Sequence, residues 1–278
     1  MTVSLERLNA LRRQSGVARA PTKPDGVDPL QVQVANLRKL LRVKRSPRQA
    51  EVSSTDRTIP GRELAPGLWL QESWLPLDAE WPTMLDGTFD RRDEIPVSDL
   101  MFFDTETTGL AGGTGTRAFM IGAAEPHMGG LRVRQLTIAT ISAEQAMLSM
   151  FQSWLSPTTI LVSYNGKSYD APLLKTRYRL MRQIEPLSPL SHVDLLHPTR
   201  RRYRGVYENC RLGTIERHVL GIVREDDLPG SEAPGAWLSY LRGGSAHLLR
   251  RVMAHNHQDV VTLARLSLHL ANRSVCSR

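Results

Sequence analysis

Two acidic residues separated by one position end an apolar stretch of the chain. Phe102 and Phe103 are followed by Asp104, Thr105 and Glu106. If the stretch forms a strand, side chains two positions apart point to the same face, so the two carboxylates lie on one side of it. Their mutual repulsion is costly unless a cation lies between them. A solvated acidic strand end is the ordinary explanation of such a pair alone, and a metal site is the alternative.

A third acidic residue, Asp170, lies between a predicted strand and a predicted helix. Pro172 follows in the first turn, where proline is favoured. An aspartate at a helix N-terminus commonly caps the free backbone amides. Capping is sufficient to explain Asp170 taken alone, although the same carboxylate can also bind a metal.

A fourth acidic residue, Asp259, lies on the apolar stripe of the last predicted helix. Leu263, Leu266 and Leu270 follow it at offsets of 4, 7 and 11. A carboxylate on that stripe is desolvated and needs a basic side chain or a metal as its partner. His255 precedes Asp259 by one helical turn, so its ring can approach the same point. An ordinary histidine near the start of the helix is the alternative explanation.

These residues lie in a pattern of strands and helices typical of an α/β protein. The pattern predicts strands over 67–74, 100–103, 118–124, 131–139, 159–163 and 192–195. It predicts helices over 143–155, 171–181 and 256–270. The three consecutive strands from residue 100 onward favour an antiparallel meander. The alternation that follows favours parallel strands, so we expect a mixed sheet with helices on both faces.

The first part of the chain differs from the rest in charge. Residues 1–57 are predicted to form a basic, flexible N-terminal arm, and residues 1–50 hold 11 basic and 3 acidic side chains. A folded domain is predicted over 58–272, in which residues 58–98 provide a lead-in strand and an acidic loop. Residues 273–278 are expected to be a C-terminal tail.

The composition favours some classes of protein and excludes others. The formal net charge of +8 favours a polyanionic partner through phosphate neutralisation, although many basic proteins bind no nucleic acid. The two cysteines, Cys210 and Cys276, are far apart, so neither a disulfide framework nor a structural zinc site is predicted. No apolar run is long enough to span a membrane, and we expect a cytoplasmic protein.

The acidic residues and their surroundings resemble the DEDD, or DnaQ-like, superfamily of 3′–5′ exonucleases. The resemblance rests on DTETTGL at 104–110, NGKSYD at 165–170 and HNHQD at 255–259. Within the superfamily, the chain looks most like the YprB-type RNase H-like domains and the exonuclease domains of family B DNA polymerases. The segments HVDLLHPTRR, CRLGTIERHVLGI and DLPG support this resemblance, which covers about residues 60–270.

The resemblance implies an RNase H-like fold in which four carboxylates hold two divalent cations, Mg²⁺ or Mn²⁺. The four are Asp104, Glu106, Asp170 and Asp259. It also implies hydrolysis of phosphodiester bonds at the 3′ ends of single-stranded or frayed nucleic acid. Hard oxygen ligands suit both metals, and a pair of such ions activates water and stabilises the leaving oxygen.

The sequence departs from the superfamily at the residue that orients water. In the superfamily this residue is a tyrosine four positions before the last aspartate or a histidine five positions before it. Here His255 lies four positions before Asp259, and Ala254 lies five positions before it. A histidine at this place can accept a proton or position water, so we predict that His255 is catalytic.

Further residues are predicted to contact the substrate or to support the site. The predicted substrate-binding residues are Thr107, Leu110, Asn165, Arg177 and Arg201. Leu110 resembles the superfamily's apolar residue that packs against a terminal base, although an ordinary core leucine explains it equally well. Arg177 and Arg201 belong to clusters that interleave arginine with tyrosine, which suits phosphate binding and base stacking as well as a solvated face. Asp194 is predicted to support the site without binding the cations.

Two other functions are compatible with the sequence. An RNase H-like domain that has lost efficient catalysis would act as a nucleic-acid-binding module, and the substitution at His255 favours it. A structure-selective endonuclease is the third possibility, because the same chemistry can cut internal bonds. The sequence does not distinguish DNA from RNA and indicates no particular protein partner.

Overall fold

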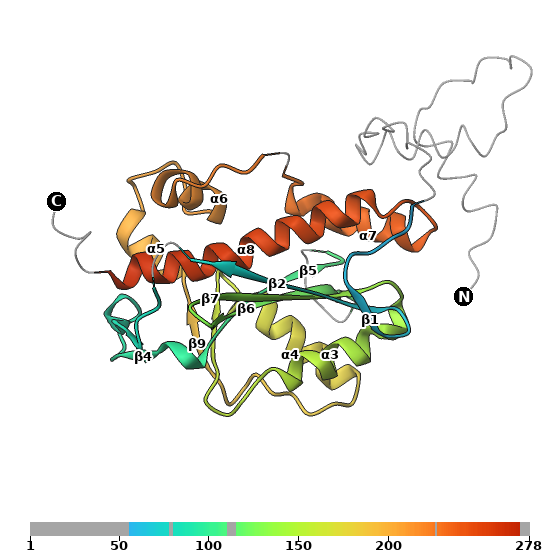
Figure 1. Cartoon of the computed structure of the whole chain (residues 1–278), viewed down its shortest axis with the longest axis horizontal. Coiled ribbons are helices and arrows are strands. Elements are labelled where there is room, and N and C mark those ends of the chain that lie inside the picture. The colour runs from blue at the N-terminus through green and yellow to red at the C-terminus, as the bar shows by residue number, and fades with distance from the viewer. Residues whose placement is uncertain (1–55, 78–79, 110–114, 226, 273–278) are drawn as a thin grey trace, which may run out of the picture. The chain divides into compact units, whose positions relative to one another are not determined.

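The computed structural model describes residues 56–77, 80–109, 115–225 and 227–272 (Figure 1). Nearly all of the predicted basic arm, Leu110 and the predicted tail lie outside the described residues. Arg57, which the sequence assigned to the arm, belongs to the folded part. Its guanidinium donates to the carbonyl oxygen of Tyr240 at 2.9 Å and lies 4.1 Å from the centre of that ring.

A seven-stranded sheet forms the centre of the domain, in the order β1-β2-β7-β6-β5-β8-β9. Its strands are β1 (Arg62–Ala65), β2 (Leu68–Pro76), β5 (Leu100–Thr107), β6 (Ala118–His127), β7 (Gly130–Ile138), β8 (Ile160–Ser163) and β9 (Ser191–Asp194). All neighbours from β1 to β5 are antiparallel, whereas β5, β8 and β9 are parallel. The predicted mixed sheet, with its meander and its parallel strands, is confirmed.

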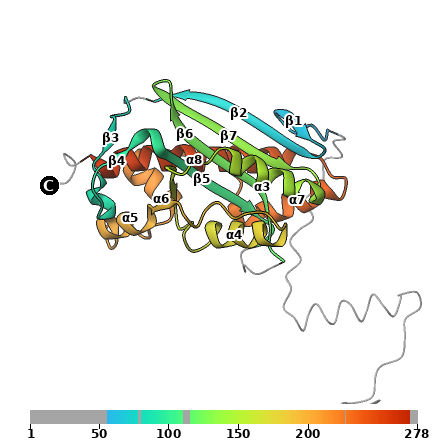
Figure 2. The ribbon, with the colours of Figure 1, turned by 90° about the horizontal axis from the view of Figure 1, so that it is seen from below.

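Helices cover both faces of this sheet, as predicted. In Figures 1 and 2, α3 (Glu144–Ser153) and α4 (Asp170–Leu180) lie on one face, and α8 (His247–Ala271) crosses the other with α7 (Ala233–Leu241) beside it. The remaining helices are α5 (Leu196–Tyr203), α6 (Leu212–Ile215) and the π-helix η4 (Glu216–Leu220). Short 3₁₀ turns are η1 (Gly87–Asp90), η2 (Val97–Asp99), η3 (Ile141–Ala143) and η5 (Gly230–Glu232).

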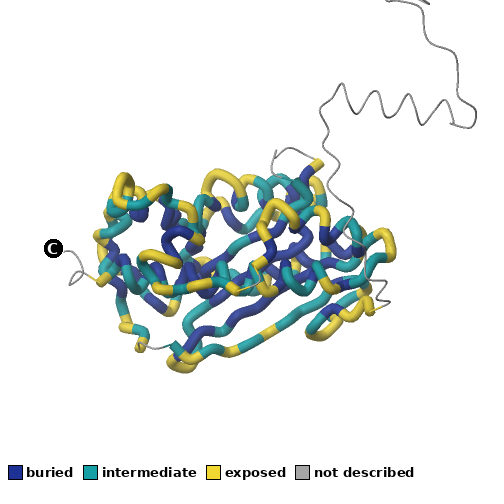
Figure 3. Tube along the Cα trace, turned by 90° about the horizontal axis from the view of Figure 1, so that it is seen from above, coloured by how far each residue is buried: buried dark blue, intermediate teal, exposed yellow. Residues whose placement is uncertain are grey.

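The side chains of β5 alternate between two clusters of the apolar core. Phe102 packs in a cluster with Val260 and Leu263 of α8, whereas Phe103 packs in a second cluster with Phe151 of α3 and Leu174 of α4. Figure 3 shows the buried residues running along the strands, with exposed residues gathered at turns. Because side chains alternate along a strand, residues at even positions of β5 point toward α8.

Several elements differ from the sequence prediction. The predicted last helix begins at His247 rather than near residue 256, because Leu249, Val252 and Met253 continue its buried stripe. Its N-cap residue, Ala246, has no capping side chain, and the hydroxyl of Ser245 accepts from the His247 amide at 3.1 Å instead. β1, α5, α6 and α7 were not predicted. The predicted acidic loop contains only short elements, including β3 (Met84–Leu85) paired with β4 (Ile95–Pro96). Among the described residues, the helices lack the combination of length and apolar character needed to cross a bilayer.

Candidate metal centre

The end of β5 extends past its parallel neighbour. Pairing with β8 stops at Phe102, opposite Val162, whereas pairing with β6 continues to Thr107. The side chains of Asp104 and Glu106 follow Phe102 on the face that α8 covers. The edge of β5 that β8 leaves open is therefore available to the chain that follows β8, which carries Asp170.

Asp104 is held by the helix that lies across this face. The side-chain amide of Asn256, in α8, donates to Asp104 Oδ2 at 2.9 Å. The amide of Gln135, in β7, donates in turn to Asn256 Oδ1 at 2.9 Å. Gly122 permits this close approach, because a Cβ atom there would lie 2.1 Å from Asn256 Oδ1. These two consecutive hydrogen bonds fix the position of the Asp104 carboxylate relative to β7 and α8.

Asp170 does not act as the N-cap residue of α4. The helix begins at Asp170 with Tyr169 in the cap position, and no side-chain hydrogen bond caps it. The Asp170 carboxylate instead accepts a hydrogen bond from the hydroxyl of Thr105, which lies between the two acids of β5. The structure thus directs this carboxylate toward the end of β5.

Asp194 organises the loop that delivers Asp170. Its carboxylate accepts from the backbone amides of Asn165 at 2.7 Å, Lys167 at 3.2 Å and Leu196 at 3.1 Å. Asn165 has a φ of 68°, a left-handed conformation that asparagine tolerates better than most residues. The side chain of Asp194 therefore holds the turn between β8 and α4, and its charge also contributes to the raised pKa of Asp170.

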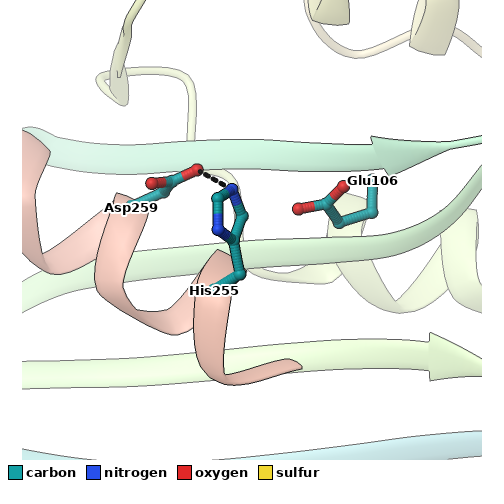
Figure 4. A group of neighbouring side chains, drawn as sticks. All are labelled: Glu106, His255 and Asp259. Atoms are coloured by element: carbon teal, nitrogen blue, oxygen red, sulfur yellow. Dashed lines mark ion pairs between the residues drawn. The ribbon is translucent and has the colours of Figure 1, made fainter. Parts of the chain in front are cut away.

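Asp259 and His255 approach Glu106 from α8 (Figure 4). One ligand atom from each of these three residues lies within 4.8 Å of the other two. His255 Nε2 is 3.4 Å from Asp259 Oδ2. The Glu106 side chain is buried, and within the described residues it has neither a hydrogen-bond donor nor an ion-pair partner. A buried carboxylate without a donor is a group that a cation would stabilise.

The pKa values of all four acids are raised. Burial raises the pKa of Asp104 and that of Glu106 well above their usual values, and repulsion from Asp259 and Asp170 raises both further. Burial also raises the pKa of Asp170, to about 6, against the opposing hydrogen bond from Thr105. The pKa of Asp259 is raised by burial too, although His255 and Arg224 oppose the shift. Four carboxylates with raised pKa values converge at one place.

Arg224, which the sequence prediction missed, connects Asp259 to a buried glutamate. Its guanidinium donates to both oxygens of Glu216, with Nη2–Oε1 at 2.6 Å and Nε–Oε2 at 2.7 Å, and it also contacts Asp259 Oδ1. Asp227 Oδ1 lies 2.7 Å from His255 Nδ1. Arg224 Nη1 lies 3.2 Å from the same ring nitrogen. These two contacts hold Nδ1 on the side of Arg224 and Asp227, so Nε2 is the ring nitrogen that faces Asp259.

The sequence contained a weak signal for this network. Glu216 belongs to the segment CRLGTIERHVLGI and Asp227 to DLPG, both of which supported the family resemblance. Gly230, the last residue of DLPG, also lies beside His255, since a Cβ there would be 3.7 Å from Nε2. No periodicity or spacing relates these residues to α8, and only the folded chain brings them to Asp259.

The structure corrects one predicted substrate contact. Arg177 is buried and forms a bidentate ion pair with Glu144 of α3, with Nε–Oε1 at 2.5 Å and Nη2–Oε2 at 2.7 Å. It joins two helices and does not present its guanidinium to a ligand. Arg201 is exposed on α5, where it donates to the carbonyl of Phe89.

Two other predicted substrate residues line a cavity at the acids. Thr107 and Asn165 form part of the wall of a cavity of about 460 Å³ that also contains Asp104 and Asp170. The hydroxyl of Thr107 donates to the carbonyl of Gly109 at 3.0 Å. A nucleotide-sized ligand in this cavity would reach both carboxylates.

The donor set fits a divalent cation of the hard or borderline kind. Glu106, Asp104, Asp170 and Asp259 offer carboxylate oxygens, and His255 adds an imidazole nitrogen. Oxygen donors suit Mg²⁺ and Mn²⁺, and a nitrogen donor shifts preference toward the transition metals.

A profile of the RNase H superfamily matches residues 101–271. The chain belongs to this superfamily. The match confirms the RNase H-like resemblance of the sequence. RNase H-like nucleases act on nucleic acid and generally use divalent metal ions, so membership agrees with the carboxylates at the end of β5.

Two individual proteins are also similar to this chain. This RNase H superfamily member is 39% identical over 179 residues to the uncharacterised protein YprB of Bacillus subtilis (strain 168), a match that covers 63% of the chain and 43% of YprB. The match therefore spans less than half the length of that relative. The family B DNA polymerase of the hyperthermophilic archaeon Pyrobaculum calidifontis is similar with a TM-score of 0.49 and 14% identity, over 60% of this chain and 24% of the polymerase.

Proposed function

We propose that this protein is a metal-dependent 3′–5′ exonuclease that hydrolyses phosphodiester bonds of single-stranded or frayed nucleic acid. The observation that carries the proposal is the buried Glu106 carboxylate, which has no partner among the described residues and faces other acids. Repulsion of this kind is tolerated in a folded protein when a cation compensates it. RNase H superfamily membership supports nucleic acid as the substrate.

In this proposal the chain's own groups have separate tasks. Asp104, Glu106, Asp170 and Asp259 hold two divalent cations, Mg²⁺ or Mn²⁺. Those cations supply an activated water and stabilise charge on the leaving oxygen when bound. His255, with its Nε2 turned toward Glu106 and Asp259, positions the attacking water and accepts its proton.

The direction of cutting is proposed from the family resemblance. DTETTGL, NGKSYD and HNHQD carry the DEDD set in the order found in 3′–5′ exonucleases. The cavity at Asp104 and Asp170 offers room for a terminal nucleotide. Progressive removal of nucleotides from a 3′ end is therefore the expected reaction.

Purified protein incubated with end-labelled DNA and RNA provides the test. We expect stepwise shortening of a 5′-labelled strand in Mg²⁺ or Mn²⁺ and no shortening in EDTA. Asp104→Asn and Asp170→Asn should abolish cleavage while the circular dichroism spectrum stays that of the wild type. Wild-type rates in both variants would refute the four-carboxylate site.

A nucleic-acid-binding module with weak catalysis is the second candidate function. The contact between Arg224 and Asp259 favours it, because a guanidinium on that carboxylate competes with a metal ion. Strand binding without shortening, at any divalent ion tested, would support this function. Products from internal cuts would support the endonuclease alternative.

A further inference from the structure

A second cavity, of about 690 Å³, adjoins the cavity at the carboxylates. The two cavities share Tyr164 and Asn165, which contribute to the wall of both. Residues of α5 and of the segment 204–212 form most of the remaining wall. A ligand longer than one nucleotide can therefore occupy both cavities by passing Tyr164 and Asn165.

The charge of the second cavity is opposite to that of the first. Arg200, Arg204 and Arg211 line it, and all three are exposed. Within the described residues none of their guanidiniums forms an ion pair. Glu208, the acidic residue of the wall, lies 3.5 Å from His218. Three neighbouring arginines without carboxylate partners repel one another, and an anion between them would relieve that repulsion.

The aromatic residues beside the arginines are already engaged. The ring of Tyr207, part of the wall, stacks on His218 at 4.8 Å and on Tyr203 at 5.8 Å between ring centres. The hydroxyl of Tyr164 donates to the carbonyl of Cys210 at 2.5 Å. Since both faces of Tyr207 are covered, that ring offers no platform for a base, and the arginines determine which ligand the cavity takes.

We propose that this cavity binds the phosphodiester backbone of the strand whose end lies at the carboxylates. This proposal rests on the proposed function, and it assigns a binding site to the part of the nucleic-acid strand that lies beyond the bond to be cut. Guanidiniums bind phosphate oxygens in a fork geometry, and contacts to phosphates carry no sequence information. The acidic cavity then holds the bond to be cut through its cations, and the basic cavity holds the phosphates that follow, whatever the base sequence.

The test compares two variants that lose the same charge. One variant carries Arg200→Ala, Arg204→Ala and Arg211→Ala, and the control carries Arg62→Ala, Arg217→Ala and Arg242→Ala, exposed arginines outside the wall. Binding of a fluorescent single-stranded oligonucleotide in EDTA is measured against salt concentration. Each phosphate contact contributes roughly 0.7 to the slope of log affinity against log salt for single strands, so we expect the slope to fall by about 2 in the first variant only.

A second readout follows substrate length. In Mn²⁺, the ratio of kcat/KM for a long oligonucleotide to kcat/KM for a dinucleotide should fall about tenfold or more in the first variant, because only the long substrate reaches the arginines. Equal slopes and equal ratios in the two variants would overturn the assignment of the cavity. A wild-type protein that binds oligonucleotide with the expected slope but cuts neither substrate would refute the proposed function and leave the strand-binding cavity standing.

Discussion

Each carboxylate of the candidate metal centre has a different set of neighbours. Asn256 donates to Asp104, Thr105 donates to Asp170, and Arg224 contacts Asp259, whereas Glu106 has no donor in the described part of the chain. A hydrogen bond leaves the acceptor's second oxygen for another ligand. These contacts thus fix one oxygen of each of three acids, and His255 Nε2 lies 3.4 Å from the second oxygen of Asp259.

His255 is the residue at which the chain departs from its superfamily, and its contacts give a prediction. Nδ1 is held by Asp227, so Nε2 is the nitrogen available to a water molecule. We expect His255→Ala to lower turnover by roughly a hundredfold, the usual scale for general-base catalysis. His255→Tyr restores the residue type of one superfamily branch and should retain most activity. Steady-state rates in Mn²⁺ measure both, and an alanine variant as fast as the wild type would leave His255 without a catalytic role.

Arg224 is predicted to influence catalysis indirectly, by positioning Asp259 and Glu216. Arg224→Lys keeps the charge but cannot donate to Glu216 and Asp259 with the same fork, so both stability and activity should fall. Arg177→Lys is the matched control, because Arg177 forms a similar bidentate pair with buried Glu144 away from the acids. We expect the two variants to lose comparable stability, on the order of 1–3 kcal/mol.

Only Arg224→Lys should change the affinity for Mn²⁺, because only Arg224 contacts one of the four acids; calorimetry on proteins that keep all four carboxylates measures this. A metal affinity that changes equally in the two lysine variants would make Arg224 a purely structural residue.

At the scale of elements, most strands and the mixed character of the sheet could be predicted better than the helices around the site, and the order of the strands came only from the structure. Strands with apolar runs between turn residues were found from their pattern, as for 100–103 and 118–124. The helix α8 was predicted too short because its N-cap residue is Ala246, a residue type that does not mark a helix start in the sequence. α5 and η4 are short and rich in charge, and α6 has only 4 residues, so these elements lack the periodicity that identifies a helix.

The same distinction applies to the residues of the site. The four acids follow local patterns, namely an alternating strand end, a helix start and an apolar stripe. Arg224 and Glu216 are far from Asp259 in sequence and meet it only through tertiary packing. Arg177 was assigned to the substrate because it belongs to a cluster of basic residues. The sequence of such a cluster does not show which guanidinium is buried, and only tertiary packing reveals that Arg177 is.

The contact between α8 and β6 gives a prediction for these two elements. Gly122→Ala would place a Cβ atom 2.1 Å from Asn256 Oδ1, and Asn256 is fully buried. The Asn256 side chain, or the helix that carries it, must shift, so we expect a loss of about 1–3 kcal/mol in the free energy of unfolding and a lower rate of cleavage, because Asn256 also holds Asp104.

Gly235→Ala in α7 is the control, since its Cβ would meet nothing within 4 Å and alanine favours helix. Denaturant unfolding and rate measurements on both variants provide the check. A Gly122→Ala protein with wild-type stability and activity would contradict the close approach.

At the scale of the whole molecule, charge is separated between neighbouring sites. Asp104 and Asp170, whose pKa values are raised, line the smaller cavity, and arginines that form no ion pair with any described residue line the larger one. Without a metal, these buried carboxylates repel one another once they are deprotonated, and this repulsion lowers the stability of the fold near neutral pH. The fold must therefore be less stable without metal than with it, and the difference must depend on pH.

The last prediction concerns this dependence and follows from Asp170. Its pKa is 3.8 in the absence of perturbation and about 6 in the folded chain, where burial favours the neutral acid. The stability that this group contributes is therefore complete below about 3.8 and is lost as pH rises through about 6. Asp104 and Glu106, whose pKa values are also raised, act in the same direction. The contribution of these groups should therefore lower the melting temperature of the metal-free protein progressively as pH rises from 5 to 7.

A divalent cation binds the deprotonated carboxylates, so it should raise the melting temperature more at pH 7 than at pH 5. Asp170→Asn removes one of the titrating groups. It should stabilise the metal-free protein at pH 7 by on the order of 1–2 kcal/mol and flatten its pH dependence, while reducing the stabilisation by Mn²⁺. Thermal melts in EDTA and in Mn²⁺ across this pH range measure all of these effects. A metal-induced shift in melting temperature that is the same at pH 5 and pH 7 would show that the cation does not bind at these carboxylates.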